Sequence, residues 1–314
     1  MTLRAKINRE GVPTANFAPW HSAGAGPITR PMKSFLKMHG LGNDFVIFDA
    51  RTFPLPIDGA AARAIADRKR GIGCDQIILI ERAKKGADAF MRIYNADGGE
   101  VESCGNAARC VGSLLMAEME KGEVVLATSG GPVYCVDAGG GSVTVDLGAP
   151  RLDWREIPMG QAVDTASFAL EVPGFDDPAL AEVAAVSVGN PHCVLFVKDA
   201  ERAPVMTLGP AIERHPWFPS RTNVEFIEPR GRGTLRMRVW ERGAGVTLAC
   251  GTGACAAAVA AHLRGITGRK VMLILDGGEL AVEWRESDDH VLMTGPAKFS
   301  FAGEVDLKAL AANA

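Results

Sequence analysis

At 314 residues the chain is long enough for about two domains, each with its own core. A hydrophobic fraction of 47%, a charged fraction of 23% and a net charge of −3 are those of a globular protein, and they give no reason to expect a nucleic acid or an acidic membrane as a partner. No apolar run approaches the length of a membrane span, and seven cysteines without a secretory signal favour free thiols in a reducing compartment. We therefore expect a cytoplasmic protein.

Residues 1–31 differ in composition from the rest of the chain. They are basic, with scattered Gly and Pro, and they contain no apolar stretch of the kind found in a secretory signal. We expect a disordered extension or a start codon assigned too early, because a strand pattern begins directly at Met32-Lys33.

The first half of the chain reads as short strands separated by glycine turns, with two helices. The strands are expected at 33–37, 45–48, 76–80, 90–94, 124–126, 133–136 and 142–147. A turn is expected at 39–44 and a helix at 60–70. A second helix should follow Cys104 and stop near Gly122.

The second half repeats this order. Asn43 and Gln76 recur as Asn190 and Asn223, each 147 positions later, and the strand at Met91 recurs 146 positions later at Met237. The glycine turns at 130–131 and 148 recur at 277–278 and 295. Several matches in one order indicate two structurally similar halves. The arginine-rich stretch 230–238 is typical of a solvated hairpin.

Two cysteines occupy equivalent positions in this repeat. Cys104 and Cys250 are each followed by Gly and then by a helical run, and the run after Cys250 extends to Leu263 with Gly265 as the C-cap. The second helix is apolar nearly all round, which predicts that it is buried. Its free N–H groups should bind an anion and stabilise a thiolate at Cys250.

These observations predict an α+β fold with two pseudo-symmetric domains. Each domain should be a mostly antiparallel sheet or barrel wrapped around a central helix, with the active site in the cleft between them. The expected boundaries are 32–150 for the N-terminal domain and 151–296 for the C-terminal one. Residues 297–314 should form a C-terminal strand or tail that returns to the N-terminal domain.

Paired thiols suit one class of reaction. Inversion at a carbon needs a base on one face and an acid on the other, and a thiol can serve as either. The Cα–H of an amino acid is a very weak acid, so donors aimed at the carboxylate must stabilise the carbanion. The backbone N–H groups of Gly105-Asn106 and Gly251-Thr252 can supply these donors.

The segments resemble diaminopimelate epimerase, a pyridoxal-independent enzyme family. The resemblance runs from His39 to Ala257 and rests on six ordered motifs: His-Gly-Leu-Gly-Asn-Asp-Phe, Gly-Ile-Gly-Cys-Asp-Gln, Asn-Ala-Asp-Gly-Gly-Glu, Cys-Gly-Asn-Ala-Ala-Arg-Cys, Gly-Asn-Pro-His-Cys, and Glu-Arg-Gly-Ala-Gly with Ala-Cys-Gly-Thr-Gly-Ala-Cys. It implies interconversion of LL- and meso-diaminopimelate in lysine and peptidoglycan precursor biosynthesis, with no cofactor or metal. It also suggests a homodimer.

The resemblance further implies a role for each matched residue. Cys104 and Cys250 would be the acid/base thiols, and His192 and Glu241 would tune them. The substrate-binding set would be Asn43, Gln76, Asn95, Gly105, Asn106, Asn190, Asn223, Glu241, Arg242, Gly251 and Thr252. A substrate with two zwitterionic ends needs many amide partners and one guanidinium, which agrees with this set.

Two departures and two alternatives accompany this interpretation. Ala107 and Val246 stand where the family often has Gly and Glu, which concerns the packing of the helix starts. A racemase of another amino acid, such as proline, is one alternative, although it would leave Arg242 and several Asn side chains unpaired. The other is a thiol redox or metal-binding protein that uses the cysteine pairs.

Overall fold

The computed structural model describes residues 32–83 and 86–312, so the predicted extension 1–31 lies outside the described residues. The chain forms two compact units. Among the described residues, unit 1 contains those up to Val145 and those from Pro296 onward, and unit 2 is Asp146–Gly295. Within the described ranges, no helix has the length and apolar character needed to cross a membrane.

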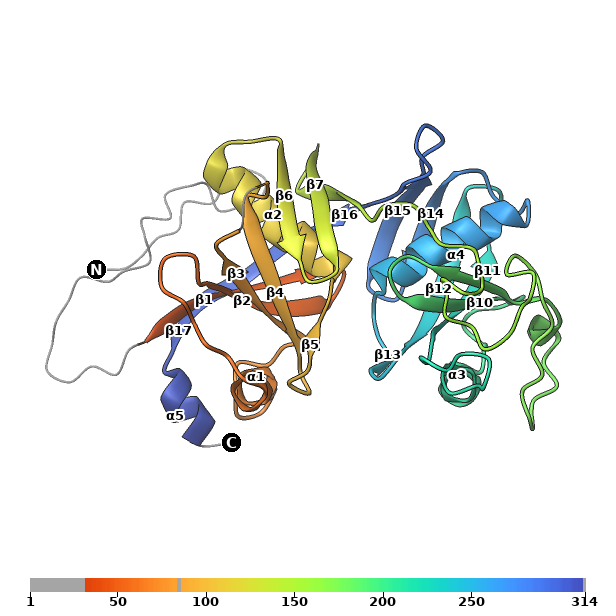
Figure 1. Cartoon of the computed structure of the whole chain (residues 1–314), viewed down its shortest axis with the longest axis horizontal. Coiled ribbons are helices and arrows are strands. Elements are labelled where there is room, and N and C mark those ends of the chain that lie inside the picture. Colours follow the sequence, from red (N-terminus) through yellow and green to blue (C-terminus); the bar gives the residue numbers. More distant parts are fainter. Residues whose placement is uncertain (1–31, 84–85, 313–314) are drawn as a thin grey trace, which may run out of the picture. The chain divides into compact units, whose positions relative to one another are not determined.

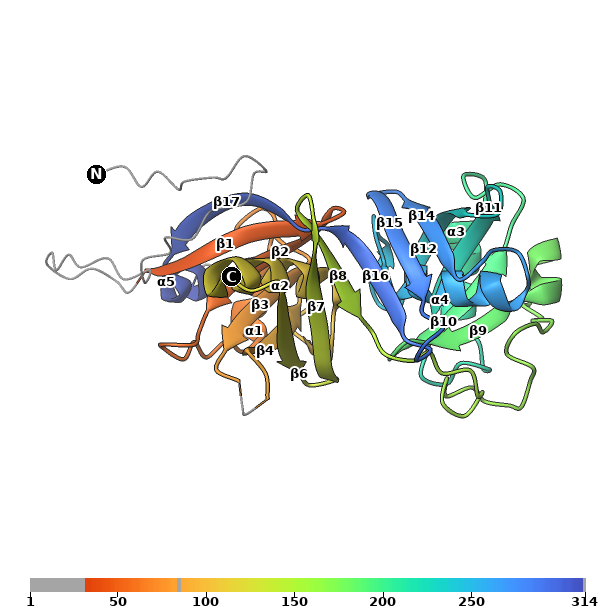
Figure 2. The same ribbon diagram turned by 90° about the horizontal axis from the view of Figure 1, so that it is seen from above.

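Unit 1 is a mixed sheet around one long helix (Figure 1). The helix α2 packs against β1, β6 and β7. The C-terminal strand β17 runs antiparallel along β1, as Figure 2 shows, so the two ends of the described chain share one sheet. The elements are β1 (Lys33–Gly40), β2 (Asn43–Asp49), α1 (Gly59–Ala66), β3 (Gln76–Glu81), β4 (Ala89–Asn95), β5 (Glu100–Val101), α2 (Gly105–Met119), β6 (Glu123–Thr128), β7 (Gly131–Gly139), β8 (Ser142–Asp146), β17 (Lys298–Val305) and α5 (Leu307–Ala312).

Unit 2 has the same kind of architecture. Its long helix α4 packs against β9, β10, β11, β14 and β15. The elements are η1 (Pro178–Glu182), β9 (Ala184–Ser187), β10 (Pro191–Phe196), α3 (Val205–Glu213), β11 (Asn223–Pro229), β12 (Thr234–Glu241), β13 (Gly245–Val246), α4 (Gly251–Leu263), β14 (Lys270–Leu275), β15 (Gly278–Trp284) and β16 (Val291–Pro296).

The strand registers confirm the predicted repeat. In the parallel pair β2–β3, Phe45 lies opposite Gln76, and in the parallel pair β10–β11, His192 lies opposite Asn223. Both residues of the second pair lie 147 positions after their equivalents in the first pair. The antiparallel pairs β6–β7 and β14–β15 also start from equivalent residues, Glu123↔Val136 and Lys270↔Glu283. The predicted mixed α+β class is therefore confirmed, with parallel and antiparallel pairs in each unit.

The two central helices begin where the sequence predicts. Helix α2 starts at Gly105 and α4 at Gly251, and α4 ends at Leu263 with Gly265 in a left-handed conformation. Helix α4 is buried on all sides over most of its length, as its uniformly apolar sequence predicts. Helix α2 ends three residues earlier than expected, because Glu120 rather than Gly122 adopts the left-handed C-cap conformation.

Two local predictions about the first half were wrong in extent. The helix predicted at 60–70 ends at Ala66, because the Asp67 carboxylate accepts hydrogen bonds from the backbone N–H groups of Lys69 and Arg70 and closes a turn there. The turn predicted at 39–44 is only two residues long. Leu41 and Gly42 both have positive φ, which is the geometry that connects twisted antiparallel strands tightly.

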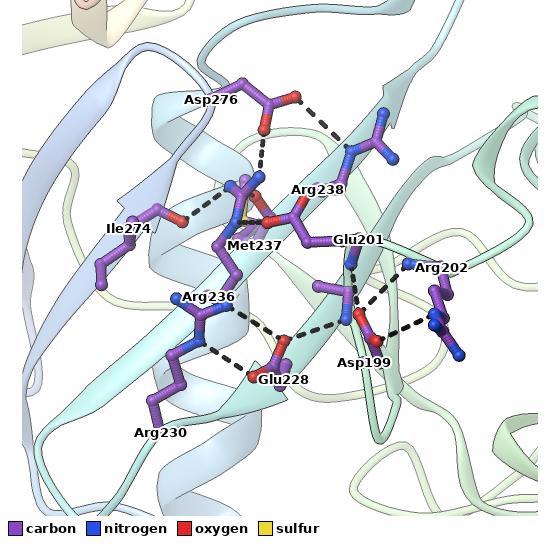
Figure 3. A network of polar contacts seen from close by, with 11 residues as sticks. Asp199, Glu201, Arg202, Glu228, Arg230, Arg236, Met237, Arg238, Ile274 and Asp276 are labelled. Carbon is purple, nitrogen blue, oxygen red and sulfur yellow. Dashed lines mark hydrogen bonds and ion pairs between the residues drawn. The ribbon is translucent and has the colours of Figure 1, made fainter.

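The hairpin predicted to be solvated contains a buried arginine, Arg236, which is 7% exposed. Its Nε donates to Glu201 Oε1 at 2.7 Å, and another guanidinium nitrogen pairs with Asp276, as Figure 3 shows. The side chain lies on β12, which pairs with β11 on one side and with β14 on the other. Because the Arg236 side chain is buried, its ion pairs with Glu201 and Asp276 replace the hydration that it loses. Arg230 and Glu228 form a more exposed pair at the turn.

Candidate active site

Both predicted thiols are N-cap residues of the central helices. Cys104 precedes α2 and Cys250 precedes α4, each with extended backbone. All seven cysteines are described, and all are free thiols. Equivalent positions in two repeated units thus present a thiol at the start of a helix, where backbone N–H groups are available.

In unit 1, four amide side chains form two hydrogen-bonded pairs, and one of these pairs lies beside Cys104. Asn43, at the start of β2, accepts a hydrogen bond through Oδ1 from Asn106 Nδ2 at 3.1 Å, and this oxygen lies 4.0 Å from Cys104 Sγ. Gln76 Nε2 donates to Asn95 Oδ1 at 2.9 Å, because β3 and β4 place these two residues opposite each other. The sheet register therefore brings together residues that are far apart in sequence.

Asp75 supports this group and was not among the predicted site residues. Its Oδ2 accepts from Asn43 Nδ2 at 2.9 Å and from the backbone N–H of Asp44 at 3.0 Å. An amide whose NH₂ is held by a carboxylate must turn its oxygen the other way, toward Cys104. The available signal in the sequence was a carboxylate placed directly before Gln76.

In unit 2, the Cys250 side chain is 4% exposed. Its Sγ accepts from the backbone N–H of Gly253 at 3.4 Å and lies 3.6 Å from Thr252 Oγ1. Asn190 Nδ2 donates to the same hydroxyl oxygen at 3.4 Å. The thiol is thus held by the first turn of its own helix and by the turn that precedes β10.

The other predicted residues of unit 2 surround the end of β12. Asn223 accepts from the backbone N–H of Arg242 at 2.9 Å and donates to the Pro191 carbonyl at 3.1 Å. The Arg242 guanidinium donates to the Ser220 carbonyl at 3.1 Å. Glu241 Oε1 accepts from the Thr247 hydroxyl. Asn223 therefore positions the backbone that carries Glu241 and Arg242.

A buried pair formed by a histidine and a carboxylate lies behind Cys250. His192 and Glu225 are both 0% exposed, and His192 Nδ1 lies 2.7 Å from Glu225 Oε1. The other ring nitrogen, Nε2, lies 2.9 Å from Asn190 Oδ1. Glu225 was also missed by sequence reasoning, although a carboxylate two residues after Asn223 in an apolar strand was an available signal.

The electrostatics of Cys250 differ from the sequence-based expectation. Burial, followed by the carboxylates of Glu241 and Glu225, raises the pKa of the Cys250 thiol well above its ordinary value, while the contacts with Thr252 and Gly253 lower it by less. The field of the helix start is therefore outweighed. Burial also raises the pKa of Glu241, against the lowering effects of Thr247 and Cys250.

The structure thus forms two clusters, one in each unit. The first comprises Asn43, Gln76, Asn95, Cys104, Gly105 and Asn106, and the second comprises Asn190, His192, Asn223, Glu241, Arg242, Cys250, Gly251 and Thr252. A groove of about 560 Å³ in unit 1, next to Leu36 and Phe48, contains none of them. In the described part of the chain, no group of three or more His, Cys, Asp and Glu side chains could hold a metal ion.

Comparison with known proteins finds a family whose model matches both repeated units. The model of the family described as diaminopimelate epimerase matches residues 35–152 and 184–300. The diaminopimelate epimerase of Rhodospirillum centenum is 53% identical over 275 residues, which is 87% of this chain and 92% of that protein. The diaminopimelate epimerase of Erythrobacter litoralis is 54% identical over 274 residues, which is 87% of this chain and 97% of that protein.

A solved structure with low sequence identity shares the fold. A hydroxyproline epimerase from Agrobacterium vitis superposes with a TM-score of 0.62 at 20% identity, covering 90% of this chain and 92% of that one. At this identity the likeness concerns the fold alone. The family match over both repeated units and the high identity of full-length relatives decide the assignment: the chain belongs to the diaminopimelate epimerase family.

Proposed function

We propose that Cys104 and Cys250 are the acid and the base with which this isomerase interconverts LL- and meso-diaminopimelate. One observation carries the proposal, namely two free thiols at the N-caps of repeat-equivalent helices. Inversion at Cα needs one group on each face of the carbon, and the repeat supplies one thiol from each unit. Membership of the family identifies diaminopimelate as the substrate.

The two cysteines start the reaction in different protonation states in this proposal. The raised pKa of the Cys250 thiol makes it a proton donor at neutral pH. In the direction in which Cys250 donates a proton, the half-buried Cys104 is the base that removes the proton from Cα. Gly105-Asn106 and Gly251-Thr252 begin the two helices, and their N–H groups are suited to hold the substrate carboxylate as negative charge develops.

The amide and guanidinium side chains are proposed to bind the rest of the substrate. Asn43, Gln76, Asn95, Asn190 and Asn223 offer uncharged donors and acceptors, and Arg242 offers a cation for a carboxylate. The same proposal includes independence from pyridoxal phosphate, a cytoplasmic location and a homodimer. The free thiols support the reducing location, and the resemblance described above supports the dimer.

The deciding experiment is turnover of LL-diaminopimelate in deuterated water, with enzyme freed of any added cofactor. We expect meso-diaminopimelate carrying one solvent deuterium at Cα. Cys104→Ala and Cys250→Ala should each lower kcat/KM by several orders of magnitude, because each removes the acid or the base. Turnover without deuterium uptake, or an alanine variant with full activity, would contradict the two-thiol mechanism.

A further inference from the structure

A chain of hydrogen bonds runs from a fully buried carboxylate to the sulfur of Cys250 within unit 2. Glu225 Oε1 lies 2.7 Å from His192 Nδ1, and His192 Nε2 lies 2.9 Å from Asn190 Oδ1. Asn190 Nδ2 donates to Thr252 Oγ1 at 3.4 Å, and that oxygen lies 3.6 Å from Cys250 Sγ. The chain joins two parallel strands, the turn before β10 and the first turn of α4.

The donors and acceptors give this chain a direction. Carboxylate and amide oxygens can only accept, so with Glu225 Oε1 on Nδ1 and Asn190 Oδ1 on Nε2 the His192 ring would donate from both nitrogens, as an imidazolium does. Asn190 uses its NH₂ group on Thr252. The hydrogen of the Thr252 hydroxyl is then left for Cys250 Sγ, and a hydrogen bond donated to sulfur favours the thiolate.

The chain has a second state with the opposite direction. If His192 loses its Nε2 proton, that nitrogen becomes an acceptor and the Asn190 amide must turn over to donate to it. The amide oxygen then takes the Thr252 hydroxyl hydrogen, and Cys250 can donate its S–H to Thr252. Imidazolium with thiolate and imidazole with thiol hold the same number of protons, so the two states exchange without a net change of charge.

A reversible epimerase needs both states at Cys250. The charged groups that act on its sulfur are Glu241 from β12 and Glu225 from β11, with the N–H of Gly253 from α4, and His192 from β10 acts on Glu241. Burial and the two carboxylates favour the thiol. Some group must offset them when Cys250 accepts the proton from Cα, and the imidazolium state of the hydrogen-bond chain does so.

We propose that Glu225 is a positioning residue that holds His192 as an imidazolium, sets the direction of the chain through Asn190 and Thr252, and so makes the Cys250 thiolate accessible. This rests on the proposed function of Cys250 as an acid/base group. Unit 1 has Phe45 and Ile78 at the positions equivalent to His192 and Glu225. These two positions are therefore not ionisable in unit 1, and Cys104 is an internal reference.

The experiment measures the alkylation rate of each cysteine by iodoacetamide as a function of pH, with peptide mass spectrometry to separate Cys104 from Cys250. Glu225→Gln should move the Cys250 profile upward by about one pH unit, which is about a tenfold loss of thiolate at a given pH below the midpoint. The Cys104 profile should not move. A carboxylate acting only as a nearby negative charge predicts the opposite sign, so a downward shift would overturn the proposal.

A double-mutant cycle tests whether the effect travels through Thr252. Thr252→Val removes the hydroxyl and should raise the Cys250 profile by a similar amount, whereas Thr252→Ser should restore it. In the Thr252→Val background, Glu225→Gln should have no further effect. If Glu225→Gln shifted the Cys250 profile equally in both backgrounds, the effect would not travel through the Thr252 hydroxyl and the proposal would be refuted. Glu228→Gln, on the same strand but paired with Arg230 at the surface, is the matched control and should leave both profiles unchanged.

A measurement on the unmutated protein covers the case in which Glu225→Gln does not fold. The imidazole ¹⁵N shifts of His192 should show a protonated Nδ1, because Glu225 accepts that proton in both states of the hydrogen-bond chain. An Nδ1 without a proton would overturn the proposal. Failure of the two-thiol mechanism is distinguishable, because it is read from epimerisation by the alanine variants and not from alkylation.

Discussion

The two cysteines occupy equivalent positions but meet different neighbours. Cys250 is 4% exposed and faces the carboxylates of Glu241 and Glu225, whereas the half-buried Cys104 lies 4.0 Å from the amide oxygen of Asn43. The two groups are both thiols, but the side chains around them differ. Each cysteine can therefore be tested separately.

Serine substitution at each cysteine should separate the two faces of the substrate carbon. A serine keeps a weak acid but loses the thiolate base. A substrate analogue with a leaving group on Cβ needs only proton removal. Cys104→Ser and Cys250→Ser should each still eliminate that group from the isomer whose Cα–H faces the remaining thiol. We expect opposite stereochemical preferences, measured by release of the leaving group from each isomer; the same preference in both variants would contradict the assignment.

The Glu225 carboxylate leaves little room for a side chain at Gly253, in the first turn of α4. A Cβ at this position would lie 2.6 Å from Glu225 Oε1 and 3.2 Å from Cys250 Sγ. The equivalent residue of α2 is Ala107. It is buried in unit 1, where Ile78 stands at the position equivalent to Glu225. The departure from Gly at position 107 thus has a physical reason, since that helix start faces no buried carboxylate from the equivalent strand position.

Gly253→Ala should lower the free energy of unfolding by about 1–3 kcal/mol, because the methyl group forces the carboxylate or the helix to move. Ala107→Gly is the matched variant in the other unit. It should lower the free energy by about 1 kcal/mol or less, through helix propensity alone, and should leave catalysis nearly unchanged. Urea denaturation and epimerisation assays measure both, and a Gly253→Ala protein as active and stable as the parent would contradict the close contact.

At the scale of elements, the β1–β2 turn is tied to the start of β3 by charge. Asp44 accepts from Arg68 at 2.6 Å, from the backbone N–H of Asp75 at 2.9 Å, and from Lys37. Although burial acts in the opposite direction, the bonds from Arg68 and Lys37 lower the pKa of Asp44 to about 2. The cluster holds the turn that carries Asn43 against the strand that carries Gln76.

This lowered pKa predicts a pH-dependent contribution to stability. A carboxylate with a lower pKa in the folded than in the unfolded state stabilises the fold above its unfolded pKa of about 3.9, and the contribution is lost as the pH falls to about 2. Asp44→Asn should therefore cost about 2 kcal/mol of unfolding free energy at pH 7 and little at pH 2. Urea unfolding at both pH values measures this, and an equal cost at both would refute the ion-pair origin.

At the scale of the whole molecule, the two units are built from different stretches of chain. Unit 2 is the continuous segment Asp146–Gly295, with a core that includes Leu195, Leu208 and Phe226. Unit 1 also needs the C-terminal segment, because β17 pairs with β1 along nearly its whole length and Leu307 and Leu310 pack on the unit 1 core.

Fragments should reflect this difference. A fragment of residues 146–295 should unfold cooperatively on heating, since it carries its own core and all its strands. A fragment of residues 32–145 should not, because it exposes the edge of β1 and the apolar face around Phe35. Neither should epimerise diaminopimelate alone. Circular dichroism melting measures the folding, and a cooperative transition for 32–145 would contradict the structural role of β17.

The elements, the repeat and the pair of thiols followed from local patterns. Helix starts at Cys104 and Cys250 are marked by glycine-flanked apolar runs, and strand pairs are marked by motifs that recur at constant spacing, so short-range chemistry suffices to find them. Family membership followed from the same motifs, because they are ordered and specific. The amide clusters were predictable as lists of residues, but not as contacts.

Other features depended on which strands lie next to each other. Arg236 is in a charged stretch of sequence, and only the pairing of β12 with β14 buries it beside Asp276. Glu225 is a single carboxylate in an apolar strand, and only the parallel register of β10 and β11 places it on His192. The pKa of Cys250 depends on desolvation and on charges brought close by folding, which outweigh the local helix field. Such effects arise from contacts between distant segments, and the tertiary structure alone determines them.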